Sequence, residues 1–343
     1  MGLNGKKTAA LVLGALLGCQ LGWGALPAGA AAPEDLSGKT ALAAEVDPGS
    51  DDALSLFLMK RSGQVPDLVL STYGNAPEKQ TSTNLRFTLQ VLDLDLPAYH
   101  GADRPWKGKK WKAPREGFHG KDGLLGLSGA LKEKAEKAGR EPRKPGSLEE
   151  ARDRLKTFHH IAYITAGPLS TLAGLLQDPR IRSRMDRVYL VGGSLAGETA
   201  EFNFAQDPKA VRAVLESGVD ITLFPVELTA TQYVEEEELQ KLARYGAWPE
   251  FLELLRANQG AHARQGEEPA AVLPALFPVL YRLDPDQFAV EDRRVTVDKT
   301  GRLTEVPQGT LVHAVLGVNP RYQWRMLCPC HFAFGFVCQD GTA

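Results

Sequence analysis

The chain has 343 residues, of which 43% are hydrophobic and 24% are charged. This composition excludes an intrinsically disordered chain and allows one large globular domain. Lys and Arg total 40 against 42 Asp and Glu, so the formal charge of −2 lacks the basic excess that binding of nucleic acid requires, and nucleic acid is not an expected partner. Four cysteines are too few for a scaffold built on disulfides.

Residues 1–32 are typical of an export signal. Lys6 and Lys7 precede an apolar stretch, and small residues of the Ala-x-Ala type end the segment. Gly and Pro interrupt the stretch before it reaches roughly 20 apolar residues, which disfavours a retained membrane anchor. Cys19 ends a sequence that is similar to a lipobox, so a lipid-anchored N-terminus is a second interpretation. We expect a protein exported to the periplasm or the extracellular space, with no transmembrane domain in the mature chain.

From Thr40 onward, short apolar runs alternate with stretches that have apolar residues at helical spacing. This alternation predicts an α/β fold with a mainly parallel, doubly wound sheet. We expect a single domain over residues 38–320 and a divergent tail over 321–343. The predicted strands are Thr40–Val46, Leu68–Thr72, Ala98–His100, Ile161–Thr165, Val188–Val191 and Ile221–Val226, and the predicted helices are Ala53–Lys60, Thr81–Leu92, one from Ser170, Pro208–Ser217 and Glu235–Ala243.

Two segments have a composition of their own. Residues 103–115 are rich in Lys, Pro and Trp. Because the net charge does not support a polyanion site, a solvated surface loop is the preferred interpretation. In the tail, Cys328, Cys330 and His331 resemble part of a metal site, but a lone cluster without a second ligand pair disfavours it.

Four carboxylates, Glu45, Asp47, Asp51 and Asp52, lie within eight positions around the turn from the first strand to the first helix. Ligands of open α/β sheets bind beyond the carboxyl ends of the strands, which is where this turn falls. A helix N-terminus stabilises each nearby carboxylate by roughly 0.3–1 kcal/mol, and the remaining repulsion favours a hard cation such as Ca²⁺ or Mg²⁺. The alternative is a plain helix cap whose other carboxylates are solvated.

Further motifs follow later strands. In chain order, the motifs are Asp47–Ala53, Gly74-Asn75, His119–Leu124, Gly167-Pro168-Leu169, Val191-Gly192-Gly193, Glu201-Phe202-Asn203 and Asp207-Pro208. This ordered set resembles the inosine-uridine preferring nucleoside hydrolase family. The resemblance covers roughly residues 40 to 310 and implies hydrolysis of the N-glycosidic bond of a nucleoside to free base and ribose.

The resemblance also implies a Ca²⁺ cofactor and a role for each residue of the site. Asp47 matches a metal ligand that also serves as general base. Asp52 matches a bidentate metal ligand, and Ala166 falls where a backbone carbonyl ligates the metal. The residues implied to bind ribose hydroxyls are Asp51, Asn75, Glu201 and Asn203.

The sequence departs from the family pattern at several positions. Where the family has a His-Asp pair before a late helix, an ungapped match places Pro274 and Ala275, which can neither ligate a metal nor donate a proton. The glutamates at 267–268 could replace that pair only through an insertion. A histidine usual in the family is missing at 229–232, and Glu45 stands where the family has Asp.

These departures leave two readings of the function. Loss of a carboxylate ligand weakens binding of Ca²⁺, and loss of a general acid typically slows a reaction by 10²–10⁴-fold. The alternative to an active hydrolase is therefore an impaired relative that only binds ribosides or metal. An Mg²⁺-dependent phosphohydrolase has less support, because no Asp-x-Asp-x-Thr motif is present. The sequence determines neither the base preference nor the oligomeric state, and a homo-oligomer stays open.

Overall fold

A computed structural model describes residues 40–108, 110–111, 118–139, 143–229, 233–244, 249–265, 270–319 and 322. These residues belong to one compact unit. The predicted export signal, the glutamates at 267–268 and the tail with its cysteines lie outside the described residues. Within the described ranges, no helix is both long and apolar enough to cross a membrane.

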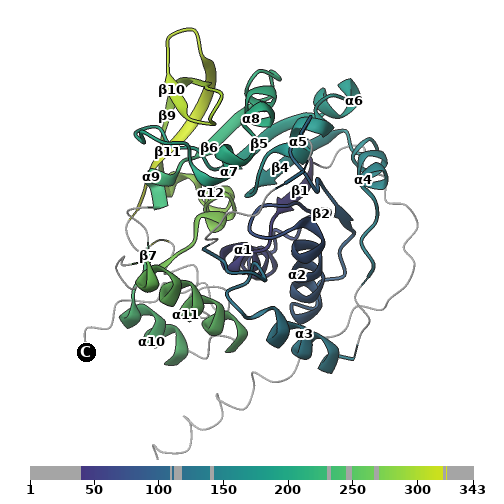
Figure 1. The fold of residues 1–343 in the computed structure, drawn as a ribbon, viewed down its shortest axis with the longest axis vertical. Coiled ribbons are helices and arrows are strands. Elements are labelled where there is room, and N and C mark those ends of the chain that lie inside the picture. Colours follow the sequence, from purple (N-terminus) through teal and green to yellow (C-terminus); the bar gives the residue numbers. More distant parts are fainter. Residues whose placement is uncertain are drawn as a thin grey trace, which may run out of the picture. The chain divides into compact units, whose positions relative to one another are not determined.

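A nine-stranded sheet organises the fold (Figure 1). Its strands are β1 (Thr40–Val46), β2 (Leu68–Ser71), β3 (Ala98–His100), β4 (His160–Thr165), β5 (Met185–Val191), β6 (Ile221–Phe224), β9 (Phe288–Val297), β10 (Leu303–Glu305) and β11 (Thr310–Val318). They lie in the order β10-β9-β11-β6-β5-β4-β1-β2-β3. The strands from β11 to β3 are parallel, and β9 and β10 extend one edge as antiparallel strands. The predicted mainly parallel α/β sheet is confirmed.

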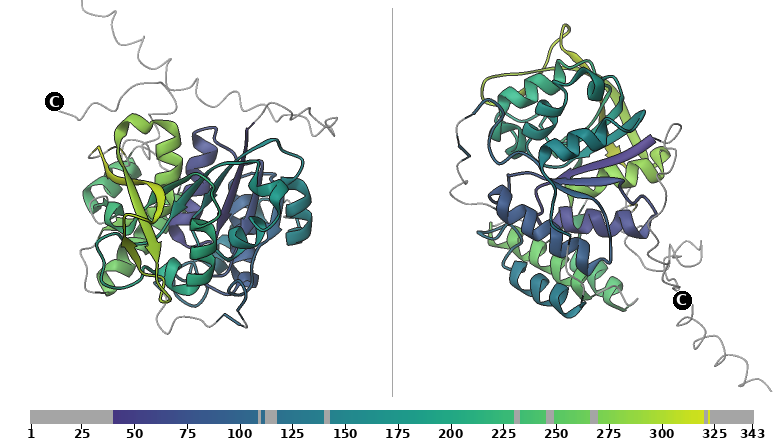
Figure 2. Two further views of the ribbon diagram at one scale, coloured as in Figure 1. Left: turned by 90° about the horizontal axis from the view of Figure 1, so that it is seen from above. Right: turned by 90° about the vertical axis from the view of Figure 1, so that its right-hand side faces the viewer.

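Helices cover both faces of this sheet (Figure 2). Successive side chains of a strand point to opposite faces, so Leu42, Ala44 and Val46 of β1 pack in one core while Ala41 and Ala43 pack in the other. The first core is covered by α1 (Ser50–Arg61), α2 (Glu78–Val91), α3 (Ser128–Lys137), α10 (Glu236–Arg244), α11 (Pro249–Arg264) and α12 (Phe277–Leu283). The second is covered by α4 (Leu148–Leu155), α5 (Ser170–Leu175), α6 (Pro179–Arg182) and α8 (Pro208–Leu215).

Short elements complete the chain near the carboxyl ends of the strands. They are α7 (Phe202–Gln206), α9 (Val226–Thr229), two 3-10 turns at Pro274–Leu276 and Pro285–Gln287, and a small sheet of β7 (Tyr233–Val234) and β8 (Ala271–Val272).

Most predicted elements agree with the structure to within a few residues. Helix α1 begins at Ser50 rather than Ala53, because the carboxylate of Asp52 accepts the N–H of Gly49 at 2.9 Å and closes the first turn. Strands β9, β10 and β11 were not predicted. Strand β9 is largely exposed and carries four consecutive charged residues, 291–294, which hide any alternation of apolar side chains.

The Lys- and Trp-rich loop is only partly solvated. Lys107 is exposed, whereas Trp106 and Trp111 are half-buried. The ring of Trp111 lies 5.8 Å from that of Tyr73, and its indole N–H donates to Gln206. The prediction of a solvated loop is therefore correct for the lysine and wrong for the two tryptophans.

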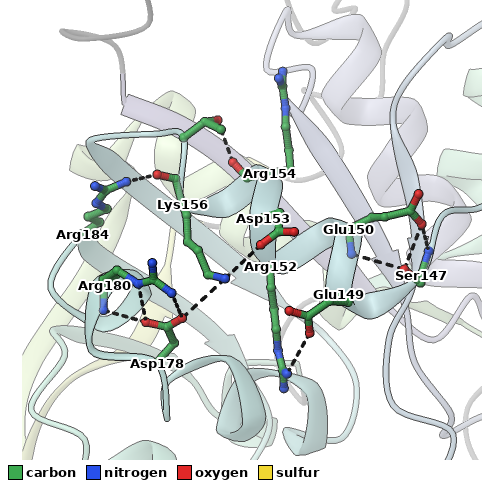
Figure 3. A network of polar contacts seen from close by, with 11 residues as sticks. Ser147, Glu149, Glu150, Arg152, Asp153, Arg154, Lys156, Asp178, Arg180 and Arg184 are labelled. Atoms are coloured by element: carbon green, nitrogen blue, oxygen red, sulfur yellow. Dashed lines mark hydrogen bonds and ion pairs between the residues drawn. The ribbon is translucent and has the colours of Figure 1, made fainter.

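The exposed helix α4 carries an ordinary N-terminal cap (Figure 3). The hydroxyl of Ser147 accepts the N–H of Glu150 at 3.2 Å, and the carboxylate of Glu150 accepts the N–H of Ser147 at 2.6 Å. The backbone N–H of Ser147 and its hydroxyl, which lies 2.8 Å from the same carboxylate oxygen, lower the pKa of Glu150. Beyond the other end of the helix, Lys156 lies 2.9 Å from Asp153 and 3.6 Å from Asp178. Asp153 is exposed, whereas Lys156 and Asp178 are half-buried.

Candidate functional site

A cavity of about 350 Å³ lies beyond the carboxyl ends of the parallel strands. Its walls come from the turns after β1, β2, β4, β5 and β6, as expected for an open α/β sheet. All the residues predicted for the site line it, namely Asp47, Asp51, Asp52, Asn75, Ala166, Glu201 and Asn203. Their individual roles stay predictions.

Asp47 is buried and held in place by Asn75. The residue is only 1% exposed, and its Oδ2 accepts the backbone N–H of Asn75 at 2.8 Å. The side-chain amide of Asn75 donates to the backbone carbonyl of Asp47 at 2.9 Å. Burial and the nearby charge of Asp52 raise the pKa of Asp47 well above its usual range. The carboxylate is thus a stronger base than one in water.

The two aspartates of the first turn of α1 are also buried. Asp51 is 7% exposed and Asp52 is 2% exposed. Oδ2 of Asp51 accepts the backbone N–H of Ala275 at 3.3 Å, but among the described residues no hydrogen-bond donor reaches Oδ1 of Asp51 or Oδ1 of Asp52. Burial and the charge of Asp51 raise the pKa of Asp52. The cap interpretation is correct for Asp52, which accepts the N–H of Gly49, and wrong in expecting the other carboxylates to be solvated.

The start of α7 contributes the second polar wall. The carboxylate of Glu201 accepts the backbone N–H groups of Gly193, Asn203 and Phe204 at 2.9, 3.0 and 3.2 Å. Burial raises the pKa of Glu201. The amide of Asn203 donates to the carbonyl of Ala166 at 2.9 Å, and that carbonyl oxygen keeps a second lone pair.

Glu45 lies next to the site but does not line the cavity. It is completely buried, and the hydroxyl of Tyr163 donates to its Oε2 at 2.8 Å. Oε1 of Glu45 has no hydrogen-bond partner among the described residues. Burial raises the pKa of Glu45 from 4.5 to about 7.

His119 lines the cavity beside Asp51. Its Nδ1 accepts the backbone N–H of Ser50 at 3.3 Å, so the neutral ring carries its hydrogen on Nε2. Nε2 lies 3.7 Å from Oδ1 of Asp51. Burial lowers the pKa of His119, which favours the neutral ring. Phe118 packs edge-on against this ring with the centroids 4.9 Å apart.

The departures from the family pattern fall on the cavity itself. Thr229 and Pro274 line it, and Ala275 is buried and binds Asp51 through its backbone. The remaining wall is mostly apolar and was not predicted, because isolated apolar residues carry no motif. The unpredicted lining residues are Phe118, Val191, Phe202, Phe224, Val226 and Gln265.

The donor set suits a hard cation. Oδ1 of Asp51 and Oδ1 of Asp52 are buried without a hydrogen-bond donor among the described residues, and both residues line the cavity. An unpaired buried carboxylate oxygen costs free energy, which a bound cation would reduce. Within the described part of the chain, no three His, Cys, Asp or Glu side chains are arranged to hold a metal ion by themselves. Backbone and water oxygens would have to complete the coordination, as Ca²⁺ sites commonly do.

The parallel sheet and its carboxylate-lined cavity define an α/β protein with an enzyme-like site. The family model of inosine-uridine preferring nucleoside hydrolases matches residues 42–325. The chain belongs to this family and is accordingly an N-glycosidase.

Curated relatives agree with this assignment. The pyrimidine-specific ribonucleoside hydrolase RihA of Photobacterium profundum is 32% identical over 58% of this chain and 64% of its own length. The non-specific ribonucleoside hydrolase RihC of Escherichia coli is 26% identical over 76% of this chain and 84% of its own length.

Solved structures show the same fold. A purine-preferring ribonucleoside hydrolase from Gardnerella vaginalis matches 85% of this chain and 98% of its own, with a TM-score of 0.73 and 19% identity. The plant nucleoside hydrolase PpNRh1 matches 84% and 97%, with a TM-score of 0.73 and 20% identity.

Proposed function

We propose that the protein hydrolyses ribonucleosides to free base and ribose, with Asp47 as the general base and Ca²⁺ as the cofactor. One observation supports this above all. The buried carboxylate of Asp47, positioned by Asn75, shares a cavity with the unpaired carboxylate oxygens of Asp51 and Asp52. A base and a cation-binding group next to each other are what activation of water needs.

Asp47, Asp52 and the carbonyl of Ala166 would hold the Ca²⁺ ion. When bound, Ca²⁺ lowers the pKa of a water molecule in its coordination shell. The N–H of Asn75 occupies Oδ2 of Asp47 and fixes the plane of the carboxylate, so that Oδ1 is the atom that takes the proton from water.

The bond between the sugar and the base breaks as water attacks the anomeric carbon through an oxocarbenium-like transition state. The bonding electrons leave with the base, which needs a proton or a hydrogen bond on its nitrogen. Of the described residues that line the cavity, His119 has the only imidazole, and its hydrogen lies on Nε2. We propose that Nε2–H of His119 supplies this hydrogen bond in place of the missing histidines.

The ribose would lie among Asp51, Asn75, Glu201 and Asn203. The carboxylates accept hydrogen bonds from sugar hydroxyls, and the amides can both accept and donate. The aromatic and apolar wall formed with Phe118, Phe202 and Phe224 fits a planar base. The named relatives include pyrimidine-specific, purine-preferring and non-specific enzymes, so all common bases are candidates.

The test is release of ribose from purine and pyrimidine nucleosides by the protein that starts at Pro33, with Ca²⁺ and with chelator. We expect chelator-sensitive turnover of at least one nucleoside. The Asp47→Asn variant serves as the inactive control. Turnover that survives both the chelator and this substitution would contradict the proposed mechanism.

A second candidate is a relative that binds ribosides or metal without turnover. The presence of Thr229, Pro274 and Ala275 at the cavity favours it, because none of these side chains can act as an acid. Calorimetric titration with Ca²⁺ and then with ribose separates the candidates. Binding without release of base from any nucleoside would establish the second candidate and overturn the first.

We also propose that the protein is exported, on the strength of residues 1–32 alone. Mass spectrometry of the mature N-terminus tests this. A first residue near Pro33 would support cleavage by signal peptidase, whereas a diacylated Cys19 would support the lipid anchor. An intact Met1 would contradict both.

A further inference from the structure

A chain of buried hydrogen bonds joins Tyr73 to Asp207 through Ser170. The hydroxyl of Tyr73 lies 2.7 Å from Oγ of Ser170, and Oγ of Ser170 lies 2.6 Å from Oδ2 of Asp207. All three residues are at most 3% exposed. A carboxylate only accepts hydrogen bonds, so Ser170 gives its single hydrogen to Asp207 and Tyr73 must donate to Ser170. The direction of the chain is therefore determined.

Asp207 anchors one end of this chain. Its Oδ1 accepts the N–H of Ala210 at 3.1 Å, which caps α8, and its Oδ2 also accepts the N–H of Trp106. The donors thus come from α5, α8 and the Lys- and Trp-rich loop. Because one carboxylate collects bonds from three segments, its position is strongly constrained.

The three residues connect segments that build the cavity. Tyr73 follows β2, and Ser170 is the first residue of α5, which follows β4. Asp207 ends α7, the helix that carries Asn203. None of the three lines the cavity, so none of them touches a ligand there. The network lies behind the site.

At its other end the chain leads to the general base. Asn75 is two residues from Tyr73 and makes both hydrogen bonds that hold Asp47, at 2.8 and 2.9 Å. Gly74 lies between them, and a Cβ atom at Gly74 would collide with Oδ2 of Asp47. The backbone at 73–75 therefore packs tightly around the carboxylate, and a shift of this segment moves the donors of Asn75.

We propose that Tyr73, Ser170 and Asp207 form a positioning network for Asp47. The inference rests on the proposed function, because it assigns the network to the residue that takes the proton. The ring of Tyr73 fills space that a phenylalanine would fill equally, so packing alone does not require the hydroxyl. The hydroxyl ties the segment that carries Asn75 to the rest of the site.

The test compares Tyr73→Phe, Ser170→Ala and the double variant by steady-state kinetics and by calorimetric titration with Ca²⁺. We expect kcat to fall by about tenfold in each single variant with KM within about twofold, because a small misplacement of a catalytic group costs rate more than binding. The affinity for Ca²⁺ should fall in parallel, since Asp47 is a proposed ligand. The kcat of the double variant should be no lower than that of the less active single variant, because both substitutions break the same chain of hydrogen bonds.

Tyr322→Phe is the matched control. Its hydroxyl is also buried and donates to the carbonyl of Leu280 at 3.4 Å, outside the network. We expect unchanged kcat and affinity for Ca²⁺. All variants are assayed well below their melting temperatures, and Ser170→Ala, which removes only one oxygen atom, carries the test if Tyr73→Phe does not fold.

Two results would contradict the proposed positioning role of the network. Variants with lower melting temperatures but wild-type kcat and Ca²⁺ affinity would show a role in stability alone. Losses that add in the double variant would show that the hydroxyls act separately. An inactive wild-type protein would instead overturn the proposed function, and this inference with it.

Discussion

Helices α1 and α4 begin with the same local chemistry but in different surroundings. Both carry two acidic residues in the first turn, and in both the third residue accepts the N–H of the cap residue. At α4, Glu150 is exposed and its hydrogen bonds lower its pKa (Figure 3). At α1, Asp52 is buried beside Asp51, and burial with this neighbouring charge raises its pKa.

This difference in burial distinguishes a carboxylate that only caps a helix from one that also lines a cavity. Exposed carboxylates at a helix N-terminus need no further partner, because water and the helix dipole stabilise them. Buried carboxylates with unpaired oxygens cost free energy until a ligand binds. We therefore expect binding of the proposed cation and ribose to offset part of this cost at the N-terminus of α1.

The largest expected effect comes from Asp47→Asn, which removes the proposed general base just before α1. We expect kcat for nucleoside hydrolysis to fall by about 10²–10⁴-fold, the usual contribution of a general base. Steady-state kinetics measures the loss. Glu150→Gln, the equivalent loss of a carboxylate at α4, should leave kcat unchanged. An equal loss of kcat in both variants would contradict the different roles expected of the two helix N-termini.

Glu45→Gln tests the cost of a buried carboxylate beside the site. Burial raises the pKa of Glu45 from 4.5 to about 7, so the folded state binds its proton more tightly than the unfolded state. The resulting stability is present below about pH 4.5 and is lost as pH rises through about 7, by about 3 kcal/mol in total. Glutamine has no charge to bury, so the variant should lack this loss of folding stability at high pH.

Chemical denaturation of the two proteins at about pH 5 and pH 8, with chelator present, measures the difference. Only the gap between wild type and variant is assigned to Glu45, because other carboxylates titrate as well. The same pH dependence in both proteins would rule out the predicted proton on Glu45.

Ala275→Asp adds a carboxylate beside the unpaired oxygens of α1 and should increase the difference in cation binding between the α1 and α4 termini. Ala275 is buried and its N–H already binds Asp51 at 3.3 Å. We expect affinity for Ca²⁺ to rise by about tenfold, because affinity follows ligand charge and number. The metal-free variant should melt at a lower temperature, since one more charge is buried. Pro274→Ala adds no charge and should change neither quantity in this way.

The smallest effect is expected at α4. Ser147→Ala removes the hydroxyl that accepts the N–H of Glu150, and loss of such a cap costs about 1 kcal/mol of folding stability. Chemical denaturation measures this change. Kinetic constants and affinity for Ca²⁺ should be those of wild type, and any change in them would mean that α4 communicates with the site.

The sequence by itself determined the sheet and the position of the site. Strand β1 is buried on both faces, so its residues from Ala41 to Ala44 are all apolar. The acidic turn that follows it had to lie at the carboxyl end of the sheet. The site residues were predicted from the ordered motifs that resemble the nucleoside hydrolase family, and every one of them lines the cavity. Exposed strands such as β9 lack that apolar signal and were missed.

Only the tertiary structure decided which partner each polar group has. Sequence cannot show that Asp51 meets the backbone of Ala275, more than two hundred positions away, or that Tyr73, Ser170 and Asp207 meet behind Asp47. The pKa of a carboxylate likewise depends on its burial and neighbours, as the contrast between Asp52 and Glu150 shows. Local patterns specify elements, whereas contacts between distant segments specify charge, hydrogen bonding and the geometry of the site.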